Sequence, residues 1–369
     1  MGKKGRKQHK AAAAGAGGGS GGSGGPATPA SKPLKMQATK CTVALLTPTF
    51  NRQRFLPYAA RCFLRQETKW CKQIYWYILD DSDEPCEDIV RGAVGDEVFA
   101  SRVRYSFVPL RMTVAEKRNA LIDRAYRDGM HIFAAFDDDD WYGPTYVKAV
   151  VQALSTSSTS LAGASSVHLY MAGIDKVART DPIMNYVNKQ KRVRECRHTC
   201  NGVLCFRRDY WDAHRYAVHK RFAEEGEFCD GGEGPFSAPI IQLENTVAYN
   251  LALNHSSNTF DKEQLLDKPN QILKTAHGLR VEEIIGPHDP EFLRFWKTLD
   301  LESRNARAAS AGGVPSQMGP AGAAPFAPPT ATLSTGHPSV GTGGGGGGEG
   351  TAAAAPGPNT LTLKMPRFR

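Results

Sequence analysis

The sequence predicts an α/β fold with a doubly wound, mostly parallel sheet, formed by residues 41–302. Three observations support this prediction. Short apolar runs alternate with helical patterns, as in consecutive βαβ units. Several of these runs end in polar or acidic residues, which places them along the rim where open α/β sheets bind ligands. Residues 1–40 and 303–369 are rich in Ala, Gly, Ser and Pro, so we expect them to be disordered tails.

The first half of the folded region, residues 41–150, contains four predicted strands. Each is a short apolar, β-branched or aromatic run bounded by turn residues, and the runs span residues 41–46, 74–79, 103–108 and 132–136. A helix is predicted over residues 55–66. Thr113 and Glu116 have the spacing of a capping box, so a helix should start there. Pro144 is expected in the first turn of the next helix, where a missing N–H does no harm.

The second half, residues 151–302, has a less regular pattern. Three segments are predicted as strands, namely residues 166–171, 202–206 and 246–253. Residues 222–229 are expected to be helical. A final amphipathic helix is predicted over residues 290–301, with its Phe, Trp and Leu side chains turned inward.

Four consecutive carboxylates, Asp137 to Asp140, follow the strand predicted over residues 132–136. Like charges at one strand end repel each other, so a cation is expected among them. Carboxylate oxygens suit Mg²⁺ or Mn²⁺ better than Zn²⁺. A solvated acidic turn is the alternative, but the position at the carboxyl end of a buried strand favours a metal site.

The charge distribution excludes some function classes. The chain carries a net charge of +9, of which residues 1–40 contribute +8 and residues 303–369 contribute +4, so residues 41–302 carry −3. Nucleic-acid binding by the fold is therefore not expected. No apolar run approaches the ~20 residues of a membrane-spanning helix, and the N-terminus lacks the apolar core of a signal peptide. We expect a soluble, cytoplasmic protein.

The eight cysteines form no pair of Cys-x-x-Cys knuckles. Cys196, His198, Cys200 and Cys205 lie close in the sequence, but their irregular spacing favours reduced thiols over zinc binding. The first predicted strand is not followed by GxGxxG, and no GxxxxGK[ST] occurs. Any bound phosphate would thus be held by a metal and by side chains such as Arg118.

Four motifs in a fixed order resemble the nucleotide-sugar-binding half of glycosyltransferase family 2, which has the GT-A fold. They are Pro-Thr-Phe-Asn-Arg after the first strand, Leu-Asp-Asp-Ser-Asp after the second, Lys-Arg-Asn-Ala-Leu on the next helix, and Phe-Asp-Asp-Asp-Asp-Trp-Tyr-Gly-Pro. The resemblance is strong over residues 41–150 and looser over residues 200–262. It implies that residues 151–302 form the acceptor and catalytic half.

The resemblance also implies roles for individual residues. The expected donor-binding residues are Thr49, Asn51, Arg52, Asp80 or Asp81, Arg118, Asn119, Asp137 and Asp138. Asp80 or Asp81 would bind the base, and Arg118 with Asn119 would approach the diphosphate. The expected metal ligands are Asp139, Asp137 and His255, with Asp139 as the direct ligand. Asp80 and Asp83 could instead be turn formers, and Arg118 a surface charge.

The catalytic base is expected in the segment that resembles the Glu-Asp motif of the family. Glu225 stands where that motif has its catalytic Asp, and Glu224 or Glu227 are the alternatives. Trp141 and Tyr142 could face a sugar or pack in the core.

These roles imply an inverting, metal-dependent glycosyltransferase that uses Mn²⁺ or Mg²⁺. The donor would be a nucleotide-diphosphate sugar, with a UDP-sugar favoured, and the acceptor a glycan or a protein. A catalytically inactive nucleotide-sugar- or glycan-binding scaffold of the same fold is the alternative. A nucleotidyltransferase is disfavoured because the Gly-rich phosphate loop is missing.

Overall fold

The computed structural model describes residues 40–312, except residues 221–223, 245, 256–257, 259–261 and 270. The chain divides into two compact units, residues 1–313 and 314–369, and every described residue lies in the first. The predicted disordered tails thus lie outside the described residues, apart from residue 40 and residues 303–312. The latter continue the last helix.

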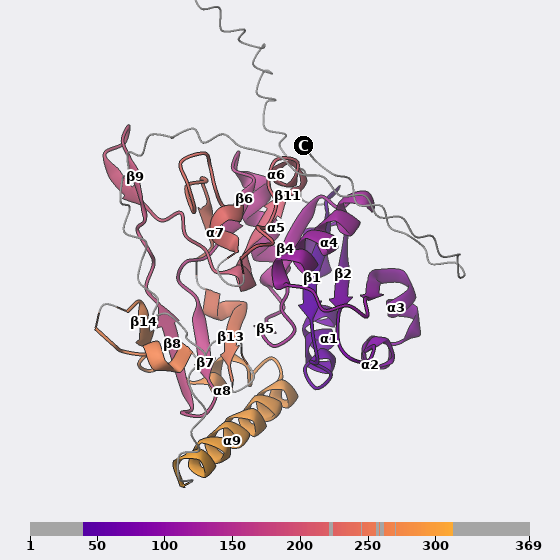
Figure 1. Cartoon of the computed structure of the whole chain (residues 1–369). Helices are drawn as coiled ribbons and strands as arrows, with labels where there is room; N and C mark the ends of the chain where they lie inside the picture. The colour runs from indigo at the N-terminus through magenta and orange to yellow at the C-terminus, as the bar shows by residue number, and fades with distance from the viewer. Residues whose placement is uncertain are drawn as a thin grey trace, which may run out of the picture. The chain divides into compact units, whose positions relative to one another are not determined.

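A seven-stranded sheet forms the centre of this unit, in the order β12-β6-β11-β4-β1-β2-β3 (Figure 1). Its strands are β1 (Thr42–Thr49), β2 (Gln73–Asp80), β3 (Val103–Phe107), β4 (Ile132–Ala135), β6 (Leu161–Gly163), β11 (Cys205–Arg207) and β12 (Ile241–Gln242). The first four strands are mutually parallel, and β11 is antiparallel to β4 and β6. Thr49 pairs in register with Asp80, so β1 and β2 end side by side.

The apolar run at residues 43–46 of β1 is covered on both faces of the sheet. Val43 and Leu45 belong to the hydrophobic cluster on one face of the sheet, and Ala44 and Leu46 belong to the cluster on the other face. A parallel strand that is covered on both faces has no solvent side, so alternation of polar and apolar residues disappears.

Five helices connect or flank these strands: α1 (Leu56–Leu64), α2 (Glu87–Val94), α3 (Asp96–Arg102), α4 (Val114–Arg127) and α5 (Tyr146–Thr156). Helix α4 begins with the predicted capping box, in which Thr113 Oγ1 accepts from the Glu116 backbone N–H at 3.2 Å and the Glu116 side chain accepts from the Thr113 backbone N–H at 2.7 Å. Pro144 precedes the N-cap residue Thr145 of α5, so its predicted place inside the first turn is wrong by two residues.

A second, five-stranded sheet has the order β14-β8-β7-β13-β5 and was not predicted. It contains β5 (Trp141–Tyr142), β7 (His168–Met171), β8 (Lys176–Thr180), β13 (Asn250–Asn254) and β14 (Leu273–Thr275). Strands β9 (Tyr186–Asn188) and β10 (Val193–Glu195) form a separate two-stranded hairpin. The predicted fold class, an α/β fold with a mostly parallel central sheet, is confirmed, and the second sheet and the hairpin add to it.

The remaining helices are α6 (Arg208–Trp211), α7 (Glu225–Phe228), α8 (Val281–Ile284) and α9 (Pro290–Gly312), with 3₁₀ turns at residues 68–70, 201–203, 246–248 and 262–265. Helix α9 confirms the predicted final helix and extends it. Buried Asp289, at the start of α9, forms ion pairs with Arg61 and Arg65 of the α1 region, which ties the last helix to the first.

Three further predictions differ from the structure. The strand predicted over residues 202–206 begins in the 3₁₀ turn at residues 201–203, and only β11 pairs. Of the helix predicted over residues 222–229, residues 222–223 lie outside the described residues, and the described part is one turn, α7. The strand predicted over residues 246–253 starts with a 3₁₀ turn, and only β13 pairs. All eight cysteines are free thiols. Among the described helices, none has the length and apolar character needed to cross a membrane.

Candidate active site

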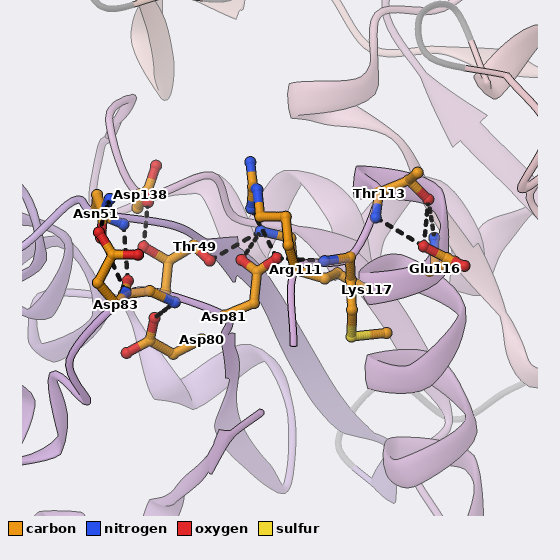
Figure 2. A network of polar contacts seen from close by, with 12 residues as sticks. Thr49, Asn51, Asp80, Asp81, Asp83, Arg111, Thr113, Glu116, Lys117 and Asp138 are labelled. Atoms are coloured by element: carbon orange, nitrogen blue, oxygen red, sulfur yellow. Dashed lines mark hydrogen bonds and ion pairs between the residues drawn. The ribbon is translucent and has the colours of Figure 1, made fainter. Parts of the chain in front are cut away.

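The carboxyl ends of β1, β2 and β4 meet at one rim of the central sheet, and the predicted donor-binding residues lie along it. Asp81 follows β2, and its side chain is fully buried. One carboxylate oxygen accepts from Lys117 Nζ at 2.6 Å, and the other accepts from Arg111 and from the Met112 backbone N–H, both at 2.7 Å (Figure 2). Lys117 Nζ also donates to the Thr49 carbonyl at 2.8 Å. Lys117 therefore joins the ends of the first two strands.

Asp80 is buried within the turn that follows β2. Its carboxylate accepts hydrogen bonds from the backbone N–H groups of Ser82 at 2.9 Å and Cys86 at 3.0 Å, and from the Tyr105 hydroxyl at 2.5 Å. These contacts make Asp80 a turn former. Asp81, the other aspartate considered for the base, borders a cavity.

Two cavities open beside Asp81. One has a volume of about 580 Å³ and is lined by Phe50, Asp81, Ser82, Asp83, Pro109 and Arg111. The other has a volume of about 310 Å³ and is lined by Pro48, Phe50, Asn51, Arg52, Arg111, Val114, Lys117 and Asp138. Phe50 and Arg111 line both, and the Arg111 guanidinium lies 3.3 Å from the centre of the Phe50 ring. The pair offers a flat, cationic wall that suits an aromatic, negatively charged ligand.

The turn after β1 holds Asn51 and Arg52 in place. Asn51 has a φ of 51°, a left-handed conformation that Asn tolerates, and its side-chain amide donates to Asp83 at 2.9 Å. Arg52 Nη1 donates to Asp139 at 3.0 Å and lies 2.9 Å from His255 Nε2. The His255 ring nitrogen itself lies 3.3 Å from the same Asp139 oxygen. Asp139 and His255, far apart in the sequence, thus meet as predicted.

The four consecutive aspartates point to different partners. Thr49 Oγ1 donates to Asp138 at 2.5 Å, and Arg118 Nη2 donates to Asp137 at 3.0 Å. Asp140 accepts from the Leu253 backbone N–H of β13 at 3.0 Å. Asp139 takes the Arg52 and His255 contacts described above. The acidic run therefore connects the two sheets.

The charge state of the run follows from these partners. Burial raises the pKa of Asp139, but the hydrogen bond from His255 and the charge of Arg52 outweigh burial and lower it, so Asp139 is ionised. Burial, with the charge of Asp139, raises the pKa of both Asp138 and Asp140. This end of β4 therefore holds more carboxylates than the nearby cations neutralise.

The predicted set of three metal ligands is not assembled. Within the described residues, no three His, Cys, Asp or Glu side chains are arranged to hold a metal ion. Asp137 is turned toward Arg118, whereas Asp139 and His255 face each other. The role of Asp137 as a third ligand stays a prediction. Mg²⁺ commonly uses one or two protein carboxylates together with substrate phosphates, and Asp139 is a carboxylate of this kind.

A second acidic pair lies on the neighbouring α7. The side-chain amide of Asn201 donates to Glu224 at 2.8 Å and to Glu225 at 3.1 Å. Arg118 Nε lies 3.6 Å from Glu224, and the other end of Arg118 binds Asp137. Arg118 is 5% exposed, which excludes the surface-charge alternative, and its Nε has no hydrogen-bond partner among the described residues. It therefore links the carboxylates after β4 to the pair on α7.

Glu225 has the electrostatics of a general base. Burial, followed by the charge of Glu224, raises the pKa of Glu225 from 4.5 to about 7. A carboxylate with a pKa near neutrality can both accept and release a proton at physiological pH. Glu227 instead forms an ion pair with Lys220 at 2.7 Å, a hydrogen bond that lowers its pKa and makes it a poorer base.

Asn119 and Arg118 are neighbours in the sequence, but their side chains bind different partners. Its amide nitrogen donates to the Tyr216 carbonyl at 2.9 Å, and its amide oxygen accepts from the Tyr216 backbone N–H at 2.9 Å. Neighbouring residues on a helix point about 100° apart, so Asn119 fastens a loop while Arg118 enters the site. Both polar atoms of the Asn119 side chain are thus bonded to the Tyr216 backbone, and its predicted contact with the diphosphate stays a prediction.

Several site residues were missed in the sequence. Lys117 stood in the quoted motif without a role, and Arg111 and Asn201 lay outside every motif. Gly202 was also missed, although a Cβ there would lie 3.0 Å from an Asp140 oxygen and 3.4 Å from an Asp137 oxygen. Trp141 and Tyr142 are buried, which settles them as core residues. The Tyr142 hydroxyl donates to the Gly202 carbonyl at 2.7 Å.

Comparison with known proteins bears on the class. Residues 44–214 match the family described as Glycosyl transferase family 2. No curated protein matches the chain. Among solved structures, S. aureus TarS 1–349 in complex with UDP is 13% identical with a TM-score of 0.39, over 58% of this chain and 61% of that chain. The mannosyltransferase PcManGT from Pyrobaculum calidifontis, in complex with GDP-Man and Mn²⁺, is 12% identical with a TM-score of 0.42, over 76% of this chain and 78% of that chain.

The chain spans less than two thirds of the TarS structures, down to 37% for one of them. The family match covers residues 44–214, which is less than half of the 369-residue chain. This part of the chain is similar to family 2 glycosyltransferases, as its motifs predicted, and the mostly parallel central sheet agrees with the predicted fold class.

Proposed function

We propose that the protein transfers a sugar from a nucleotide-diphosphate donor, with a UDP-sugar favoured, to an acceptor hydroxyl. One observation carries this proposal. Buried Arg118 contacts Asp137 after β4 and lies 3.6 Å from Glu224 at the start of α7, so the donor-side carboxylates adjoin the acidic pair that contains Glu225. A site that only bound nucleotides would have no need of the second pair.

The nucleotide would occupy the two cavities beside Asp81. The stacked pair of Phe50 and Arg111 offers a face to the base. Arg52 and Lys117 line the adjoining cavity and supply positive charge for the diphosphate. Thr49 fixes the position of Asp138, which lines this cavity, through its hydrogen bond to the Asp138 carboxylate.

A divalent ion, Mn²⁺ or Mg²⁺, would be held by Asp139 and His255 and would act as a Lewis acid on the departing nucleoside diphosphate. Arg52 contacts both residues, so it would add positive charge beside the same phosphates. Asp137 is instead paired with the guanidinium group of Arg118.

Glu225 would take the proton from the acceptor hydroxyl as its oxygen attacks the anomeric carbon from the face opposite the nucleotide, with inversion. Asn201 holds Glu224 and Glu225 together, and Arg118 lies beside Glu224. Burial, followed by the charge of Glu224, raises the pKa of Glu225.

A panel of nucleotide sugars tests the proposal. The full chain is incubated with each sugar and with Mn²⁺, Mg²⁺ or EDTA, and both thermal stabilisation and donor hydrolysis are measured. We expect one UDP-sugar to raise the melting temperature and to be hydrolysed only with the metal. Stabilisation without hydrolysis or transfer would indicate the binding scaffold instead, and the absence of both effects for every sugar would contradict the proposal.

A further inference from the structure

The hairpin of β9 and β10 carries a concentration of positive charge beside the acceptor half of the site. We define the basic hairpin as residues 184–197. Its exposed cations are Lys189, Lys191, Arg192 and Arg194. In Figure 1, β9 lies apart from the labelled strands of both larger sheets.

The charge of the basic hairpin is not balanced within it. Its one acid, Glu195, accepts from Asn188 at 2.7 Å and forms ion pairs with Arg197 at 3.1 Å and Lys191 at 3.5 Å. Among the described residues, no ion pair involves Lys189, Arg192 or Arg194. These cations lie on or next to two paired strands, so their positions are fixed relative to one another. Clustered positive charge of this kind attracts a negatively charged partner.

The hairpin also has the features of a surface that accepts another strand. Among the described residues, β9 and β10 hydrogen-bond only to each other, so each has an open edge. Met184, Val187 and Val193 are 45%, 56% and 48% exposed. An extended peptide can add to such an edge through main-chain hydrogen bonds, with its side chains meeting alternate residues of the hairpin.

The base of the hairpin is attached to the proposed catalytic helix. Arg197 donates to the Ser237 carbonyl, and Asn185 donates to the Phe236 carbonyl at 3.1 Å. The Phe236 backbone N–H in turn donates to the Gly226 carbonyl of α7 at 2.9 Å, next to Glu225. On the other side, the chain reaches Asn201 six residues after β10. A ligand on the hairpin is therefore held at the acceptor side of the site.

We propose that the basic hairpin docks an acidic, extended segment of a protein acceptor by strand addition, and so presents a nearby hydroxyl to Glu225. The inference rests on the proposed function and adds the class of acceptor. Charge complementarity selects an acidic segment, and the open strand edges with exposed Val and Met side chains select a polypeptide over other polyanions.

Binding of labelled peptides tests this proposal. Fluorescein-labelled peptides in which serine alternates with glutamate, glutamine or lysine are titrated with the full chain, and fluorescence polarisation is measured at low and high salt. The test variant is Lys189→Gln/Lys191→Gln/Arg194→Gln. The matched control, Lys72→Gln/Lys176→Gln/Lys268→Gln, removes three exposed lysines elsewhere on the described surface.

We expect the serine-glutamate peptide to bind more tightly than the other two, and the test variant to weaken it by about tenfold through the loss of three exposed ion pairs. The control should bind as the native chain does. A serine-glutamate peptide with N-methylated backbone keeps its charge but cannot pair with a strand, so it should bind more weakly.

Equal binding by the test variant and the native chain would overturn the proposal, as would tight binding of heparin together with no peptide preference. Metal-dependent donor hydrolysis, measured in parallel, should be unchanged in the test variant. If the native chain shows no donor hydrolysis, the proposed function is contradicted. The peptide titration would still test whether the basic hairpin binds an acidic peptide.

Discussion

The substitution Glu225→Gln should abolish transfer and stabilise the protein at the same time. The raised pKa means that ionised Glu225 costs folding free energy. A rise from 4.5 to about 7 corresponds to ~3 kcal/mol. Because the Glu225 side chain keeps partial contact with solvent, we expect roughly 1–3 kcal/mol.

The pH dependence of this gain has a definite sign. Below the unfolded pKa of 4.5, Glu225 is protonated in both states, so native and variant proteins differ little. As the pH rises to about 7, the unfolded chain ionises first and the folded state loses stability. The gain of Glu225→Gln should therefore be absent at acid pH and complete above about pH 7.

Urea unfolding at several pH values measures the stability, and sugar transfer from the donor identified by the panel measures the activity. We expect transfer to fall at least ~100-fold, the usual contribution of a general base, while metal-dependent donor binding persists. Glu227→Gln on the same helix is the matched control, since its carboxylate pairs with Lys220, and it should keep transfer. Full transfer by Glu225→Gln, or its loss only in Glu224→Gln, would refute the assignment of the base.

Three further predictions concern the framework of the site. Lys117→Met leaves buried Asp81 without its closest cation, so the melting temperature should fall by the equivalent of ~3 kcal/mol. Thr113→Ala removes the capping box and should cost ~1 kcal/mol in urea unfolding, whereas Thr145→Ala, at a helix start without a side-chain cap bond, should cost less. Asn201→Ala should lower kcat more than it changes KM and move the acid limb of the kcat profile to higher pH, because an amide that donates to the ionised base is lost.

The sequence predicted those elements whose formation depends on residues close together in the chain. The strands β1 to β4 are continuous apolar runs, and a capping box depends on residues three positions apart, so both could be recognised directly. Two strands of the second sheet, β7 and β13, lie within or overlap predicted strands, but their assembly with β5 and β14 could not be recognised. Strands β5 and β14 have only two and three residues and pair with segments distant in the sequence. Strand β13, for example, joins β7 and β5 across about a hundred residues.

The site shows the same division. The motifs pointed to Asp139 and His255, which the structure brings within 3.3 Å of each other. The motifs could not show that Arg118 would bind Asp137 and turn it away from Asp139 and His255, since that depends on how α4 packs against β1 and β2. Asn201 has no sequence signal at all, because its role comes from its distance to two glutamates more than twenty residues away.

Calorimetric titration of the native chain and of Asp139→Asn with UDP, in the presence of Mn²⁺ and of EDTA, tests the central claim most directly. If Asp139 holds the ion that binds the diphosphate, the native chain should bind UDP much more tightly with Mn²⁺ than with EDTA, and the variant should lose that difference while it unfolds as the native chain does. A Mn²⁺ effect of equal size in both proteins would contradict the account.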